Sequence, residues 1–333
     1  MVALSAPKVL RLPNRAVQVG WTVGRNALQM IIVALGATFL IFALLRTIPG
    51  DPAQILAGPG GSVTPAQIAK TRLELGLDKP LVTQYWDWIS SAAQGNFGHS
   101  LVLNDTVAQL LSSRLLVTLQ LATYSLFFAL ALSIPLSVLA ARWQGNGADS
   151  LVRVVSATGV AIPSFWLALL LIIAFQGVLP TFGYAPFGDG IVPHLQHMVL
   201  PSMALGAGLT TLLFETNRAS LVATLSSDYV RTARSFGLSE RKIYNRYALR
   251  NALLPTITVA GLEIGSLMAG ALLVENAFAI PGMGRLLVQG VLSRDYPVVQ
   301  GCILVLVTIV VALNLTMDVV YAVVDPRVRR GRG

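Results

Sequence analysis

The sequence predicts an all-α polytopic membrane protein with six transmembrane helices and an extracytoplasmic subdomain between the first two. Composition is the first observation: only 12% of the 333 residues are charged, against about 25% in an ordinary soluble domain. Hydrophobic residues make up 54%, and the mean hydropathy is +0.68. The second observation is six apolar runs, each long enough to cross a bilayer, which takes about 20 helical residues. Such long, uniformly apolar runs exclude barrel strands, so helices must satisfy the backbone in lipid.

The six predicted spans follow one another along most of the chain. The first is longer than the apolar region of a signal peptide and lacks a small-residue cleavage site, so we interpret it as a retained span. The fourth is interrupted by Glu215, Asn217 and Arg218. The spans are predicted at Ala27–Leu45, Leu115–Ala141, Val154–Leu179, Met198–Leu225, Ala252–Val274 and Val298–Val324.

Lysine and arginine in the loops predict the orientation of these spans. If both termini lie on one side, that side carries 17 of the 24 basic residues, whereas the short loops opposite carry only Arg285 and Arg294. Both termini should therefore be cytoplasmic. The same bias accounts for the net charge of +9, which in a soluble protein would suggest a nucleic-acid partner; none is expected here.

The predicted organisation follows from the spans. Residues 1–26 and 325–333 are cytoplasmic tails, 27–114 hold the first helix and the extracytoplasmic subdomain, and 115–324 form a five-helix transmembrane domain with a polar loop at about 226–250. The outer segment after the first span is too long for a plain connector. Its aromatics, Tyr85, Trp86 and Trp88, could form an interfacial belt or the core of the subdomain; the segment's length favours the subdomain.

The polar 226–250 loop lies between two long apolar runs. Its spacing permits a helix up to Phe236, Gly237 can stop that helix, and Ser239 can cap a second short helix with Glu240 in its first turn. A compact helix-turn-helix at a membrane surface offers an exposed surface that a partner protein can bind. The other interpretation, a loop whose arginines only fix topology, is equally open on pattern alone.

The sequence contains no recognisable catalytic or nucleotide-binding motif. No G-x-x-x-x-G-K-[ST] phosphate loop occurs, and no serine- or cysteine-based catalytic set is credible, so the chain is expected not to be an enzyme and to hold no cofactor. If transport is active, its energy must come from an ion gradient or from a partner ATPase.

Glu215, Glu263 and Asp318 lie within or at the edges of predicted spans, where acids are costly and often functional. They could form a proton relay, or they could face a water-filled cavity or pair with neighbouring polar groups. The second interpretation is favoured, because no carboxylate pair repeats in matching halves of the chain.

His194 and His197 are spaced to share one helix face, as a metal site requires. Asp189 is the only further ligand nearby, and ordinary loop histidines are the favoured interpretation; no metal site is expected.

Several blocks resemble one known family. The 226–250 loop resembles the signature loop of binding-protein-dependent ABC importer permeases, and the other blocks resemble the B-type subunit of its dipeptide/oligopeptide (peptide/nickel) branch. The similarity covers nearly the whole chain beyond the N-terminal tail. Serine and phenylalanine stand where the family usually has Ala-Lys, which puts one polar contact in doubt, although the turn glycine is kept. The blocks are Tyr229–Arg234, Gly237–Ser239, Arg250–Pro255, Pro49–Pro52, Leu75–Pro80, Gly95–Ser100, Glu275–Phe278, Pro281–Arg285 and Arg294–Pro297.

The resemblance implies a permease in the lipid of a bacterial or archaeal plasma membrane. Its expected partners are a second homologous permease, two cytoplasmic ATPases that bind ATP and magnesium, and an extracytoplasmic substrate-binding protein. The resemblance also implies that Ala233, Gly237, Leu238 and Ser239 belong to a coupling helix that docks on an ATPase. The residues expected at an extracytoplasmic gate or a contact with the binding protein are Glu275, Phe278, Pro281, Gly282, Gly284 and Asp295.

The expected function is therefore the transmembrane permease subunit of an importer for dipeptides or oligopeptides. The resemblance does not choose among peptides, nickel, glutathione and haem. The alternatives are a proton-coupled secondary transporter that acts without an ATPase, and a membrane scaffold.

Overall fold

The computed structural model describes residues 15–47, 69–70, 72–73, 78–147, 150, 154, 159 and 161–324, with side chains described from Gly24 to Met317 within these ranges. Residues 1–14 of the predicted N-terminal tail, the whole predicted C-terminal tail, much of the predicted extracytoplasmic subdomain and the Asp318 side chain therefore lie outside the described residues. So do the Pro49–Pro52 block and the first half of the Leu75–Pro80 block. Residues 15–26, predicted as tail, are helical.

Helices account for most of the described chain, and no strand occurs within it beyond a single bridge between His99 and Thr106. The all-α prediction is confirmed. A 3-10 turn covers Phe187–Asp189, and a π-helical segment covers Ile243–Ala248. The α-helices are α1 (Arg15–Thr47), α4 (Leu81–Ala93), α5 (Val107–Arg142), α7 (Ser164–Phe175), α8 (Ile191–Leu225), α9 (Asp228–Ser235), α10 (Glu240–Lys242), α11 (Leu249–Leu262), α12 (Ile264–Ala277), α13 (Met283–Ser293) and α14 (Tyr296–Val324).

Four helices in the described part of the chain are long and apolar enough to cross a membrane: α1, α5, α8 and α14. The segment from α10 through α12 is long and apolar enough as a whole, but its two parts meet at a 50° bend. It makes a fifth span if the two parts are counted as one. Of the third predicted span, 154–179, the structure describes α7, which has 12 residues and is too short to cross alone. The described residues thus support a polytopic protein without confirming the number six.

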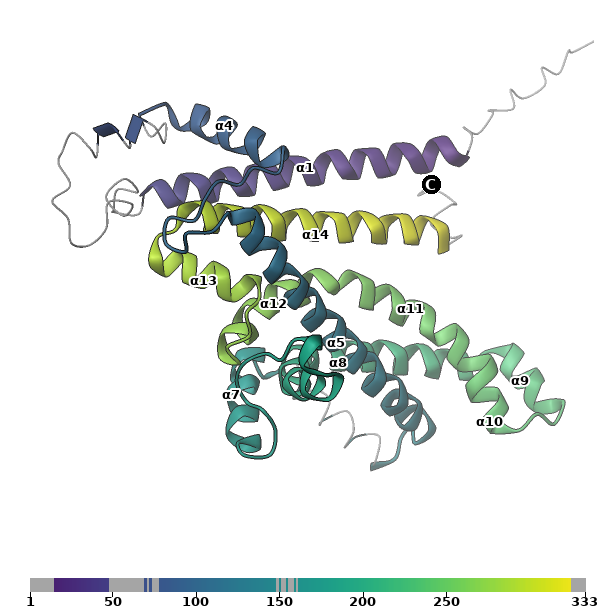
Figure 1. Ribbon diagram of the computed structural model, residues 1–333. Helices are drawn as coiled ribbons and strands as arrows, with labels where there is room; N and C mark the ends of the chain where they lie inside the picture. Colours follow the sequence, from purple (N-terminus) through teal and green to yellow (C-terminus); the bar gives the residue numbers. More distant parts are fainter. Residues whose placement is uncertain are drawn as a thin grey trace, which may run out of the picture.

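The helices form two packed groups. α5 lies against α8, and α11 and α12 complete this group, whereas α1 lies alongside α14 at the edge of the molecule (Figure 1). Much of the α1 surface is apolar and exposed, for example Leu28 at 59%, Ile32 at 60% and Val33 at 69%. Exposed apolar side chains on a helix of this length are what a lipid-facing surface requires.

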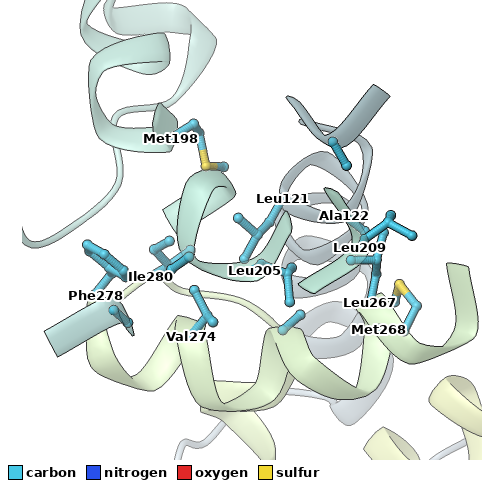
Figure 2. Close-up of a cluster of buried hydrophobic side chains, with 14 of the residues drawn as sticks. Leu121, Ala122, Met198, Leu205, Leu209, Leu267, Met268, Val274, Phe278 and Ile280 are labelled. Carbon is cyan, nitrogen blue, oxygen red and sulfur yellow. The ribbon is translucent and has the colours of Figure 1, made fainter. Parts of the chain in front are cut away.

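The main core lies between α5, α8 and α12. Figure 2 shows Leu121 and Ala122 with Leu205 and Leu209, and Leu267 close by. The remaining labelled members of the cluster are Met198, Met268, Val274, Phe278 and Ile280. Because these side chains come from three helices, their packing fixes how α12 and the turn after it sit against α5.

The aromatics of the outer segment pack on the first span. The Tyr85 hydroxyl of α4 lies 2.8 Å from the Thr38 hydroxyl of α1 and donates to the Leu35 carbonyl at 3.0 Å. The Tyr85 ring packs edge-on against Phe42. Trp86, in contrast, is 67% exposed. Tyr85 therefore joins α4 to α1.

The two ends of the helical bundle carry different loops. In Figure 1 the start of α1, the end of α14 and the α9–α10 turn lie toward one end, and α4 and α13 toward the other. This arrangement agrees with the relative placement that the loop charges predict for the 226–250 loop and the outer segments.

Candidate functional site

The 226–250 loop folds as the sequence predicts: α9 ends at Ser235, and Gly237 has a φ of +74°. The amide of Leu238 donates to the Ala233 carbonyl at 3.3 Å, and the amide of Gly237 donates to the Arg234 carbonyl at 2.9 Å. These two bonds define a Schellman motif, in which a residue with positive φ ends the helix. The predicted stop at Gly237 is therefore a built turn.

Ser239 caps the next helix through its backbone. It is extended, with φ −64° and ψ 143°, and its carbonyl accepts from the Lys242 amide at 2.9 Å. Its side chain makes no capping hydrogen bond, so the expected side-chain cap is absent. Across the turn, Arg234 Nε donates to a Glu240 carboxylate oxygen at 2.7 Å, and this pair joins α9 to α10.

A small apolar seam holds this turn together. Val230 and Ile243 are fully buried and Ala233 is 7% exposed; Leu238 packs against them. Ala233, predicted to belong to the coupling surface, therefore uses its side chain inside the turn. The turn presents Phe236 outward instead: its ring is 81% exposed, directly before Gly237. Sequence analysis noted this phenylalanine as a departure from the family pattern but did not predict that it is exposed.

At the opposite end of the bundle, Glu275 caps α13 from the end of α12. Its Oε2 accepts from the Gly284 amide at 2.7 Å and from the Arg285 amide at 3.2 Å. Thr118 of α5 donates to the same carboxyl group at 2.6 Å and accepts from the Met283 amide at 2.8 Å. The first amides of a helix have no acceptor within the helix, and the residue before α13 is a glycine, which has no side chain to accept them. Glu275 and Thr118 supply the missing acceptors.

The two glycines of this turn are required by close approach. A Cβ at Gly282 would lie 2.2 Å from the Glu275 carboxyl carbon, and a Cβ at Gly284 would lie 2.3 Å from the Leu272 Cα. The neighbouring Pro281 carbonyl accepts from Arg114 at 3.4 Å. The turn between α12 and α13 is therefore tightly packed and is tied to α5.

A second buried acid, Asp295, joins α14 to the segment before α5. One of its oxygens accepts from the Ser100 hydroxyl and from the Leu101 amide at 3.2 Å. The other accepts from the Val298 amide at 3.4 Å, in the first turn of α14. Arg294, just before it, has a left-handed φ of 58° and ends α13.

The structure thus brings Glu275, Gly282 and Gly284 together, and it places Asp295 in a separate cluster. The side chains of Glu275 and Phe278 are 0% and 1% exposed, and that of Asp295 is 1% exposed. They hold the turns in place from inside. Sequence reasoning missed Thr118, because no local pattern links a threonine of α5 to a glutamate 157 residues later.

His194 and His197 were predicted to lie in a loop, but they lie in the first turns of α8. The predicted loop location is therefore wrong. His194 is fully buried; its Nδ1 lies 2.7 Å from the Ala185 carbonyl oxygen, and Phe187 stacks on its ring. His197 Nδ1 lies 2.8 Å from the Pro193 carbonyl oxygen. The helix could start here because Gly190, with φ +113°, turns the chain into α8. No group of three metal-ligating side chains occurs among the described residues.

Comparison with known proteins gives the class. Residues 133–330 match the family model described as binding-protein-dependent transport system inner membrane component, and residues 21–122 match the model of the N-terminal part of such membrane components. The chain is 39% identical to a putative peptide transport system permease protein of Brucella abortus, over 92% of this chain and 98% of the relative. It is 38% identical to the glutathione transport system permease protein GsiC of Escherichia coli K12, over 92% and 97%.

The chain belongs to the family of binding-protein-dependent transport system inner membrane components. It is a permease subunit of an ABC importer, not an enzyme, and a multi-pass membrane protein. As a member of such a system it works with a substrate-binding protein and an ATPase. This membership decides against the solitary secondary transporter and the scaffold.

Proposed function

We propose that this chain forms half of the translocation pathway of a peptide importer. It pairs with a second, homologous permease, and two ATPases that bind ATP and magnesium drive the pair. The names of the two relatives, a peptide permease and a glutathione permease, support a peptide substrate, since glutathione is itself a small peptide. Both termini and the 226–250 loop face the cytoplasm, as the loop charges predict.

The coupling contact is the turn around Gly237. The observation that carries this assignment is the exposure of Phe236: a large aromatic side chain, 81% exposed, projects from a turn whose own apolar seam is already complete. A rigid aromatic anchor presented by a preorganised turn is what a groove on a partner protein can bind. Gly237, Leu238 and Ser239 fix the geometry of this turn, and Ala233 holds it from inside.

The outer turns contribute to the mouth of the pathway. Glu275, Phe278, Pro281, Gly282 and Gly284 keep α12, α13 and α5 in one rigid unit, and Asp295 holds α14 to the segment before α5. We propose that this unit forms part of the extracytoplasmic gate. The binding protein would contact exposed neighbours such as Leu292, which is 80% exposed.

Phe236→Ala tests the coupling assignment. The ring contributes little to the chain's own packing, so the variant should fold and insert normally. Losing a central aromatic anchor costs about 2 kcal/mol or more of binding, which is roughly 30-fold in affinity. Co-purification of the ATPases with the permease pair should fall accordingly, and substrate-stimulated ATP hydrolysis with it. Trp86→Ala, which removes a similarly exposed aromatic at the opposite end, is the matched control. Wild-type ATPase recovery with Phe236→Ala would refute the assignment.

A further inference from the structure

A cavity of about 390 Å³ lies where α7 begins, beside the middle of α8 and the first half of α12. Its floor is apolar and comes from the main core: Leu205, Leu209 and Leu267, labelled in Figure 2, line it. Glu263 and Ser266 of the α11–α12 segment also line it. The volume falls within the range of about 300–1,000 Å³ that is typical of small-molecule sites.

Glu263 is the charged group of this cavity. It stands at the 50° bend between α11 and α12 and at the centre of the predicted span Ala252–Val274. Its amide bonds to Val259, but its carboxyl group has no hydrogen-bond or ion-pair partner among the described residues. A carboxylate at this depth is expensive in lipid, so it must face water, protein or a ligand. A bend in a helix at the membrane midplane is where transporters of other classes place their ligand sites.

The remaining lining is small or polar. Ser164 and Ser266 add hydroxyl groups, and Gly208 and Gly270 leave the helix surfaces open. A Cβ at Gly270 would lie 2.8 Å from Leu205 Cδ1, so this glycine also lets α12 approach α8 closely. None of the described lining residues carries a positive charge, so the carboxylate is not neutralised within the cavity.

We propose that this cavity binds a primary ammonium group of the transported substrate, with Glu263 as its counter-ion. An ammonium offers three donors, which the carboxylate and the two serine hydroxyls can accept. The free amino terminus of a peptide is such a group, so this assignment rests on the proposed function. The apolar floor accommodates the aliphatic part of the ligand.

Thiol labelling tests the site without assuming a substrate. Cys302, the sole cysteine, is fully buried and can be replaced by alanine. In that background Ser266→Cys places a thiol one turn from Glu263. In the assembled complex, the ratio of its reaction rates with a cationic and an anionic methanethiosulfonate reagent should fall about tenfold when Glu263→Gln is added. Glu215→Gln, which removes a carboxyl group of α8 outside this cavity, is the control and should leave the ratio unchanged.

Uptake by the complete complex in proteoliposomes tests the ligand. Glu263→Gln should lower kcat/KM for a peptide with a free amino terminus at least fivefold, and Glu263→Asp should restore part of it. An unchanged labelling ratio would overturn the site while leaving the importer role intact. A lowered ratio with wild-type uptake would overturn the ammonium ligand. Absence of peptide uptake by the wild-type complex would refute the proposed peptide substrate, and with it the assignment of a substrate ammonium group to this cavity.

Discussion

Glu275 joins three helices through a single carboxyl group. It is fully buried and accepts hydrogen bonds from Thr118 and from two amides of α13. A Cβ at Gly282 would overlap the Glu275 carboxyl group, so only glycine leaves room for it. A buried acid whose oxygens are all used in this way is a structural cap, and its removal leaves several donors without partners.

Glu275→Ala should therefore lower the free energy of unfolding by about 3 kcal/mol, because each buried donor left unsatisfied costs about 1–3 kcal/mol. The measurement is the thermal unfolding midpoint of the purified permease in detergent. Gln289→Ala, on the exposed face of α13, is the control and should behave as wild type. A Glu275→Ala midpoint equal to that of the control would show that the cap is dispensable.

At the scale of elements, α9 and α10 are short, and their arrangement depends on the turn between them. The Schellman bonds, the Arg234–Glu240 pair and the buried Val230 and Ile243 fix the direction in which the turn points. Gly237 is the one position of this turn with positive φ. A Cβ there would meet nothing within 4 Å, so substitution costs backbone strain and not a clash.

Gly237→Val and Gly237→Asn both add a side chain, but they differ in how readily the residue adopts a positive φ. Valine should cost about 1–2 kcal/mol in the left-handed conformation, whereas asparagine adopts it more readily. Gly237→Val should re-aim α10, so that the permease still inserts and pairs but loses ATPase docking and substrate-stimulated hydrolysis. Gly237→Asn should retain both, since the turn is preserved. Equal ATPase co-purification for the two variants would mean that the turn geometry does not matter for docking.

For the whole molecule, the arrangement of helices separates two functional ends. The α9–α10 turn lies at one end of the bundle, and the outer turns around α13 lie at the other (Figure 1). The α11–α12 segment runs between these ends and contains both the bend at Glu263 and the cap at Glu275. A movement imposed on the coupling turn can therefore reach the cavity and the outer turns through one continuous segment.

Site-directed reporters test this two-ended arrangement. A reporter placed at Gly95 and one placed at Gly237 should report opposite sides of the membrane, with Gly237 cytoplasmic, because the loop arginines favour that side. The readout is alkaline phosphatase against green fluorescent protein activity in matched fusions. The same side for both positions would rule out an odd number of crossings between them and, with it, the six-span topology.

The sequence by itself determined the membrane class, the positions of the long helices and the stop at Gly237. These features are local: apolar length decides a span, and a glycine after a short polar helix decides a turn. Only the tertiary structure decided that Thr118 meets Glu275, 157 residues away, and that Ser100 meets Asp295, 195 residues away. It also placed His194 in a helix and bent the fifth span at Glu263. Such contacts arise when separate helices pack, and no periodicity along one chain segment encodes which distant donor will satisfy a buried acid.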